Sequence, residues 1–435
     1  MPKEDEFPEE MQVEGFWDDV NGGWLPEKLV KAARQEELEW VHRREVYRKV
    51  DEQECFQVTG KPPISLRWVD TNKGSLAKPN IRSRLVAREL KCRTPELTAA
   101  ELFSAMPPLE ALKLLASLLV SQKYSKRGGL LKLRFYDISR AHFYGRPKRP
   151  VYVNLPDEER EEGKCGFLEK TMYGTRDASN AWQSDYTELL EEDAFVGGVA
   201  SPAIFYSEAQ DLRILIHGDD FGVLGDDEAQ DFMEATLAKR YDYKCTGRLG
   251  PRDSDGDECV FLNRVIRYQG PAEAPTIEIE ADQRHVEVAL ESLGLTGSKA
   301  VATPSIKVRL DEVEAEQDLP ALGAEHSTLF RSVLMRISYI AQDRPDVAEA
   351  MKCLSRRMVA PSSADFQRLK RLARYLAGKP RAVIVFRPQS LPTAIRVEVD
   401  SDHAGDLVTR RSTTYGHGWH VRRPLPYRIQ FLNSP

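Results

Sequence analysis

Cysteine and histidine are scarce in this chain of 435 residues, which has six cysteines and eight histidines. The cysteines stand singly, and none belongs to a Cys-x-x-Cys pair. Neither a zinc knuckle nor a disulfide framework is indicated, so we expect a reducing, intracellular compartment, cytoplasmic or nuclear. His403, His417 and His420 are spaced like metal ligands, but no fourth ligand stands nearby. A metal site there is disfavoured.

Long apolar runs are also missing. No stretch of about 18 apolar residues occurs and the N-terminus is acidic, so neither a membrane span nor a secretory signal is expected. Residues 1–24 are predicted to be disordered. The length suggests two or three domains, and an apolar content of 41% allows sizeable cores.

The net charge of −6 argues at first against a nucleic-acid partner, yet the charge is unevenly distributed. Residues 61–150 hold 19 Lys or Arg against 6 Asp or Glu, a local surplus of 13. A basic face of that size favours binding of a template strand, and Arg127 and Lys132 are expected to belong to it. The alternative is a merely solvated charged face.

Two adjacent carboxylates, Asp219 and Asp220, separate two short apolar runs. This pattern predicts a β-hairpin with the acidic pair at its turn. Acidic side chains held side by side repel each other unless a cation lies between them, which favours a divalent metal. The alternative is a solvated hairpin turn.

A further carboxylate, Asp137, ends an alternating segment over residues 131–138 that predicts a half-buried strand. A site for two metal ions in nucleotidyl transfer needs carboxylates from more than one strand. Asp137 together with Asp219 and Asp220 would meet that need. Taken alone, an Asp at a strand end is more often a turn former.

The chain resembles the copia-type retrotransposon reverse transcriptases in a series of motifs that follow the family's order over roughly residues 35–420. These are Trp68-Val69, residues 82–88, Leu102-Phe103-Ser104, residues 136–145, residues 151–156, residues 168–174 with Ala181-Trp182, residues 217–220, residues 301–304, residues 344–347, residues 370–376 and residues 400–406 with residues 411–413. The resemblance implies an α+β right-hand polymerase fold of fingers, palm and small thumb. A helical connection and a truncated ribonuclease H-like α/β piece would follow.

The resemblance also implies an activity and a role for each matching residue. RNA-directed DNA synthesis would transfer a nucleotide from a dNTP to a primer 3′-hydroxyl on an RNA or DNA template, without a membrane partner. Asp137, Asp219 and Asp220 would be catalytic and would hold two Mg²⁺ ions. The nucleotide-binding residues would be Arg82, Arg84, Arg88, His142 and Asp177, with His142 where the family has an aromatic ring against the ribose 2′-hydroxyl.

Two departures from the family pattern concern activity. The family's Tyr-Val-Asp-Asp turn is His217-Gly218-Asp219-Asp220 here, which keeps both carboxylates. Asp177 replaces a Gln that touches the incoming nucleotide, and its charge would repel a triphosphate unless Arg176 or a metal offsets it. The alternative function is therefore a decayed, inactive transposon remnant that retains only nucleic-acid binding.

Five segments are predicted. They are a disordered N-terminus (1–24), the reverse transcriptase fingers, palm and thumb (25–305), an acidic linker (306–326), the helical connection (327–380) and a partial ribonuclease H-like domain (381–435). In the last segment only Asp400 matches a ribonuclease H metal ligand, Asp402 and Asp406 being its neighbours on one turn. Ribonuclease H activity is therefore not expected.

Overall fold

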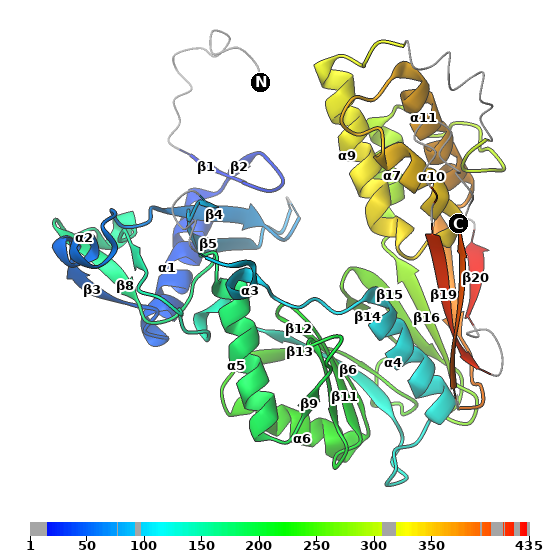
Figure 1. The fold of residues 1–435 in the computed structure, drawn as a ribbon, viewed down its shortest axis with the longest axis horizontal. Coiled ribbons are helices and arrows are strands. Elements are labelled where there is room, and N and C mark those ends of the chain that lie inside the picture. Colours follow the sequence, from blue (N-terminus) through cyan, green and yellow to red (C-terminus); the bar gives the residue numbers. More distant parts are fainter. Residues whose placement is uncertain are drawn as a thin grey trace.

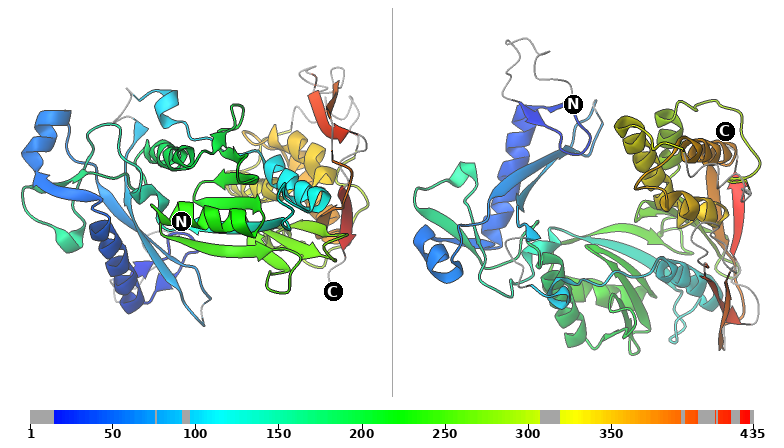
Figure 2. Two further views of the ribbon diagram at one scale, coloured as in Figure 1. Left: turned by 90° about the horizontal axis from the view of Figure 1, so that it is seen from below. Right: turned by 45° about the horizontal axis from the view of Figure 1, so that its top comes forward.

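The structure is a computed structural model that describes residues 15–75, 77–91, 97–306, 319–391, 394–401, 412, 414–421 and 427–432. Figure 1 shows three parts arranged as an open U, and Figure 2 shows the first and third rising from opposite ends of the second. We call them the fingers (residues 15–91 and 150–175), the palm (97–149 and 176–249) and the thumb (250–391). This arrangement confirms the predicted α+β fold.

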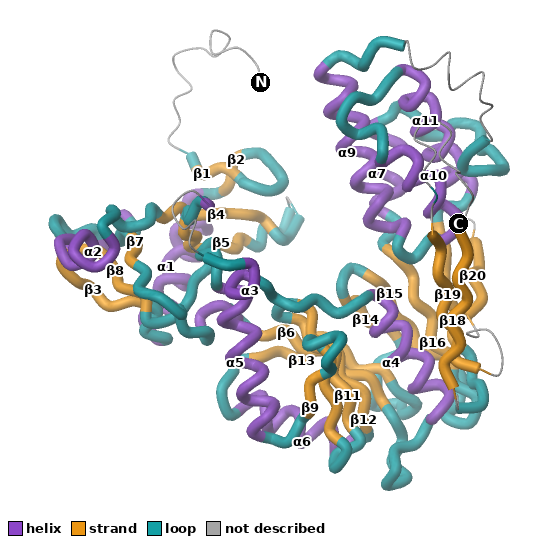
Figure 3. The backbone as a smooth tube through the Cα atoms, viewed as in Figure 1, coloured by secondary structure: helices purple, strands orange, loops and turns teal. Residues whose placement is uncertain are grey.

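The palm is an antiparallel sheet in the order β13-β6-β12-β11-β10-β9. Its strands are β6 (Lys132–Ile138), β9 (Val196–Gly197), β10 (Ile204–Ser207), β11 (Leu212–His217), β12 (Asp220–Gly225) and β13 (Tyr243–Leu249). Its helices are α3 (Ala99–Leu102), α4 (Leu109–Gln122), the short 3₁₀ helix η4 (Ala141–Phe143), α5 (Ala178–Glu192) and α6 (Asp227–Ala238). Figure 3 shows α5 and α6 packed against the palm strands.

Both faces of β6 are covered by helices. Successive residues of a strand point to opposite sides, so neighbouring residues of β6 enter different cores. Phe135 packs in the core that contains α4, whereas Tyr136 packs in the core that contains α5 and α6. The strand that carries Asp137 is therefore held rigidly from two sides. None of the helices that the structure describes is long and apolar enough to cross a lipid bilayer.

Two basic residues expected to face a template form ion pairs with carboxylates of the protein itself. Lys132 is buried, and its Nζ lies 2.8 Å from Asp227 Oδ1 and 3.0 Å from Asp255 Oδ1. Arg127 Nη2 lies 2.8 Å from Asp226 Oδ1. The expectation is wrong for Lys132, because that side chain is buried between two carboxylates. Arg127 is exposed, and its contact with a template stays a prediction.

The fingers combine helices with three small antiparallel sheets. The sheets are β1 (Phe16–Trp17) with β2 (Trp24–Leu25), β4 (Leu66–Asn72) with β5 (Ile81–Ala87), and β3 (Tyr47–Asp51) with β8 (Lys164–Leu168) and β7 (Tyr152–Val153). The helices are α1 (Glu27–Arg43), α2 (Glu52–Thr59) and the 3₁₀ helix η5 (Asp157–Glu159). Residues 1–14 of the predicted disordered segment lie outside the described residues. Residues 16–25, in contrast to the prediction, form the β1–β2 hairpin.

The thumb is a helical bundle attached to a second sheet. Its helices are α7 (Arg284–Ser292), α9 (Ala324–Ala341), α10 (Pro345–Ser355) and α11 (Ser363–Gly378). Val286 and Ala289 of α7 share one core with Leu334 of α9 and Leu372 of α11. The predicted division between a thumb that ends at 305 and a connection that begins at 327 therefore does not separate two cores. Residues 307–318 of the predicted linker lie outside the described residues.

The second sheet has the order β14-β15-β16-β17-β20. Its strands are β14 (Glu258–Phe261), β15 (Arg264–Gln269), β16 (Thr276–Ala281), β17 (Arg381–Phe386) and β20 (Tyr427–Leu432). β17 pairs with β16, and Arg381 Nη2 lies 2.8 Å from Glu280 Oε2. The structure thus differs from the predicted ribonuclease H-like segment 381–435, of which two strands, β17 and β20, extend the thumb sheet.

Two more strands follow, β18 (Ala394–Ser401) and β19 (Thr414–Val421), which pair only with each other among the described strands. Asp400 lies in β18 opposite Tyr415. Asp402, His403 and Asp406 lie outside the described residues.

Candidate active site

A tight turn presents the acidic pair. β11 and β12 pair as a hairpin whose last opposed residues are His217 and Asp220, so that Gly218 and Asp219 form the turn. Gly218 has a φ of 65° and Asp219 does not have a positive φ, which fits a type II′ hairpin with Gly at its first central position. The Trp182 indole donates a hydrogen bond to the Gly218 carbonyl at 2.8 Å and fixes the turn.

Strand pairing brings the third carboxylate to this turn. β12 pairs with β6 in a register that sets Asp220 directly opposite Asp137, and the Ile138 N–H donates to the Asp219 carbonyl at 2.9 Å. Opposed residues in an antiparallel pair have Cα atoms about 4.5–5.5 Å apart. The structure therefore brings together the three carboxylates that the sequence predicts, all of them half-buried.

Crowding of negative charge is visible in the pKa values. Burial, followed by repulsion from Asp219 and then from Asp137, raises the pKa of Asp220 to about 7. Burial and Asp219 also raise the pKa of Asp137, against the opposing effect of Arg82, Lys244 and Arg84. Bringing these carboxylates together is electrostatically unfavourable, and a bound cation would relieve that cost.

The three carboxylates do not form a complete metal cage. No group of three His, Cys, Asp or Glu side chains close enough to enclose an ion occurs in the described part of the chain. Mg²⁺ commonly takes only one or two protein carboxylates and completes its octahedron with water and substrate phosphates. An open set of carboxylates fits that chemistry.

Two arginines of β5 act on this site. Arg82 and Arg84 lie two residues apart, so their side chains leave the same face of the strand. The Arg84 guanidinium lies 4.7 Å from the centre of the Tyr173 ring, and its buried Nε has no hydrogen-bond partner. Arg88 follows the end of β5 and is exposed, and it is not one of the cations that chiefly lower the pKa of Asp137. The structure thus joins Arg82 and Arg84 to the carboxylates but not Arg88.

His142 lies beside the same tyrosine. Its ring packs edge-to-face on Tyr173, with ring centres 5.0 Å apart and an interplanar angle of 89°. Burial lowers the pKa of His142, so the imidazole is neutral near pH 7. Tyr173 therefore links His142 to Arg84. Sequence reasoning gave no role to Tyr173, or to Lys244, which stands opposite Asp137 on β13.

Asp177 takes up a different environment from the one expected. It precedes α5 and is buried, and neither carboxylate oxygen has a hydrogen-bond partner in the described structure. Arg149 Nη2 lies 3.9 Å from Asp177 Oδ1 and 2.5 Å from Glu89 Oε1. Arg149 is thus a cation beside Asp177 that the sequence did not indicate.

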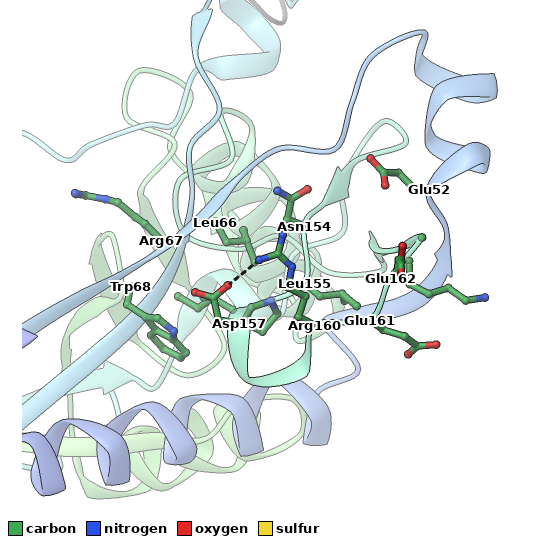
Figure 4. Close-up of a pocket in the computed structure, with 14 residues that line it drawn as sticks. Glu52, Leu66, Arg67, Trp68, Asn154, Leu155, Asp157, Arg160, Glu161 and Glu162 are labelled. Atoms are coloured by element: carbon green, nitrogen blue, oxygen red, sulfur yellow. Dashed lines mark ion pairs between the residues drawn. The ribbon is translucent and has the colours of Figure 1, made fainter. Parts of the chain in front are cut away.

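A separate pocket of about 900 Å³ lies in the fingers, between β4 and residues 154–164 (Figure 4). Its charged side chains have both signs, and Asp157 pairs with Arg160, three residues further along the chain, at 3.9 Å. It contains none of the residues predicted to bind metal or nucleotide. The pocket is therefore distinct from the carboxylate site.

A palm sheet with opposed carboxylates on a hairpin turn and a neighbouring strand defines the class of palm-type nucleotidyl transferases. The family model described as "Reverse transcriptase (RNA-dependent DNA polymerase)" matches residues 45–307, and the chain belongs to this family. The resemblance to copia-type retrotransposon reverse transcriptases is confirmed by similar curated proteins.

Among these relatives are two plant retrovirus-related Pol polyproteins. The one from transposon TNT 1-94 of Nicotiana tabacum is 23% identical over 402 residues, covering 89% of this chain and 28% of the polyprotein. The one from transposon RE1 of Arabidopsis thaliana is 26% identical over 359 residues, covering 79% of this chain and 22% of the polyprotein. The chain thus spans about a quarter of their length.

A solved structure of a foamy viral protease-reverse transcriptase in complex with double-stranded DNA is also similar. It shares 10% identity and a TM-score of 0.45, covering 93% of this chain and 56% of the other. The likeness is too distant to carry residue roles across.

Proposed function

We propose that this chain is an RNA-directed DNA polymerase that uses two Mg²⁺ ions. The observation that carries the proposal is the register of β6 with β12, which sets Asp137 opposite Asp220 beside Asp219. These carboxylates would hold the ions. When bound, the ions activate the primer 3′-hydroxyl and stabilise charge on the triphosphate.

The protein's own side chains would position the nucleotide. Arg82 and Arg84 would bind its phosphates, since a guanidinium fork matches phosphate oxygens. His142, braced by Tyr173, would lie under the sugar as a neutral ring and exclude a 2′-hydroxyl. Arg149 beside Asp177 would reduce the repulsion between that carboxylate and a triphosphate. The described cysteines are all free thiols, which supports a cytoplasmic or nuclear location.

Primer extension on poly(rA) with oligo(dT) and Mg²⁺ tests the proposal. Asp219→Asn should lower the extension rate by more than about tenfold, or about 1.4 kcal/mol, while template binding persists. Asp231→Asn is the control, because that carboxylate is largely exposed on α6. An Asp219→Asn rate above about a tenth of the parental rate would remove Asp219 from the metal site. Template binding without extension by the parent chain would favour the decayed remnant.

A further inference from the structure

Two tryptophans stand exposed on the β1–β2 hairpin, outside the region that the family model matches. Trp17 is 52% exposed and Trp24 is 63% exposed. They are cross-strand partners, and their rings meet edge-to-face with centres 5.2 Å apart. Large aromatic side chains are usually buried, so two on one small hairpin indicate a binding surface.

Glycine beside the rings makes room for this arrangement. A Cβ atom on residue Gly15 would lie 2.7 Å from the Trp24 ring, which is closer than two non-bonded carbon atoms approach. Trp24 therefore lies against bare backbone on one side, and more than half of its surface remains open. The pair presents a fixed aromatic surface rather than two independent side chains.

The hairpin is held firmly on β4. The Asn72 N–H donates to Asp18 Oδ2 at 2.9 Å, and the Asp70 N–H donates to Asp19 Oδ2 at 2.9 Å. Asn21 Nδ2 donates to the Asn72 carbonyl at 3.0 Å. Backbone hydrogen bonds to Asp18 hold the pKa of its carboxyl well below its usual range, although burial opposes them. The aromatic surface is therefore preorganised, which lowers the entropic cost of binding.

Two exposed lysines without an ion pair to any described residue follow the strand on which the tryptophan hairpin lies. The acids of this region are already engaged, since Asp70 binds Arg34 at 2.6 Å and Asp18 and Asp19 accept the hydrogen bonds above. Lys73 and Lys78, in the turn that follows β4, are exposed and form no ion pair with any described residue. Lys73 follows Asn72, the residue on which the hairpin turn rests. Single-stranded nucleic acid offers bases that stack on aromatic rings and phosphates that bind cations. The exposed tryptophans and lysines match these two kinds of group.

We propose that Trp17 and Trp24 form a stacking platform for unpaired bases of the template strand, with Lys73 and Lys78 contacting its phosphates. Figure 1 shows β1–β2 beside β4, at the end of the fingers remote from the palm. The platform thus serves template that has not yet reached the carboxylates. That the bound strand is a template rests on the proposed polymerase function, but the test measures only the binding of single-stranded nucleic acid.

Equilibrium binding without dNTP tests the platform. The ligands are one primer–template duplex with a single-stranded template overhang of about sixteen nucleotides and the same duplex with blunt ends. The Trp17→Ala/Trp24→Ala variant should bind the overhang duplex at least about fivefold more weakly, the lower end of base stacking on an aromatic ring. Binding to the blunt duplex should not change. The Trp17→Phe/Trp24→Phe variant should restore most of the lost affinity.

The lysines are tested through salt. Lys73→Ala/Lys78→Ala should make the slope of log affinity against log salt shallower by about 1.4 units for the overhang duplex, as expected for two lost contacts to a single strand. Lys239→Ala, which removes a lysine paired with Asp193 in the palm, is the control and should leave the slope unchanged.

Phe56→Ala is the control for loss of an exposed aromatic ring, because Phe56 is 47% exposed on α2. Unchanged thermal unfolding would show that the tryptophan variants are folded. Overhang affinity within twofold of the parent in the folded double-alanine variant would overturn the proposal. So would a change in oligomeric state without a change in overhang affinity, since the pair would then bind a protein. Because no synthesis is measured, failure of the polymerase proposal cannot produce either result.

Discussion

At the scale of single residues, the candidate site gathers three carboxylates on two paired strands, with Tyr173 and Lys244 around them. Asp137, Asp219 and Asp220 were predictable because each ends or begins an apolar run, so their place on strands follows from a local pattern. Tyr173 and Lys244 were missed, because their positions depend on packing and strand pairing between distant segments. Lys132 was misjudged for the same reason, since its partners lie on α6 and in the loop after β13.

The raised pKa of Asp220 predicts a pH dependence of stability in the absence of metal. Its ordinary value is 3.8 and its folded value is about 7. Between these values the folded chain holds a proton that the unfolded chain has released. The free energy of unfolding should therefore fall as pH rises from about 4 to about 7 and then change no further through this group.

Urea denaturation in EDTA at about pH 5 and about pH 8 measures this effect. Asp220→Asn cannot ionise, so its stability relative to the parent should increase between the two conditions. Asp231→Asn, on an exposed carboxylate, should track the parent. If the free energy of unfolding of Asp220→Asn changes with pH as that of the parent does, the carboxylates repel each other less than their strand register implies.

At the scale of elements, β5 meets the segment that precedes α5 through a close backbone approach at Gly174, within the fingers. Its φ is 87°, and a side chain there would begin 2.0 Å from the Ala87 carbonyl oxygen. The Ala87 N–H in turn donates to the Tyr173 carbonyl at 2.7 Å. The glycine thus lets β5, with its arginines, lie directly against the segment that carries Tyr173.

Gly174→Ala should reduce the free energy of unfolding by more than about 2 kcal/mol, because the strain of a positive φ adds to the clash with Ala87. Gly294→Ala is the matched control. Its φ is 63°, and a side chain there would meet no atom within 4 Å, so only the conformational strain of about 1 kcal/mol should remain. Urea unfolding of both variants measures the difference. Equal losses would mean that the approach to Ala87 relaxes without cost.

At the scale of the whole molecule, the order of fingers, palm and thumb was predictable from the order of the motifs, but the boundaries after residue 305 were not. The reason is long-range pairing. Ile279 of β16 lies opposite Ile384 of β17, and nothing local in either strand specifies a partner about a hundred residues away. The helices between them looked like a separate connection for the same reason, although α7 shares their core.

The last prediction tests that continuity by comparing two shortened chains. A chain that ends at residue 306 keeps the region matched by the family model but loses α9, α10, α11 and β17. Val286 and Ala289 of α7 would then face water, and β16 would become an open sheet edge. A chain that ends at residue 391 keeps all of these partners, and its sheet loses only the edge strand β20.

We therefore expect the shorter chain to aggregate or to show little near-ultraviolet circular dichroism, whereas the chain ending at 391 elutes as a compact species and unfolds cooperatively. Gel filtration and thermal unfolding of both chains provide the comparison. A compact, cooperatively unfolding 306-residue chain would show that fingers and palm do not need the bundle. In that case α7 would have to cover its apolar face in another way, and the thumb would be an added domain rather than part of one folding unit.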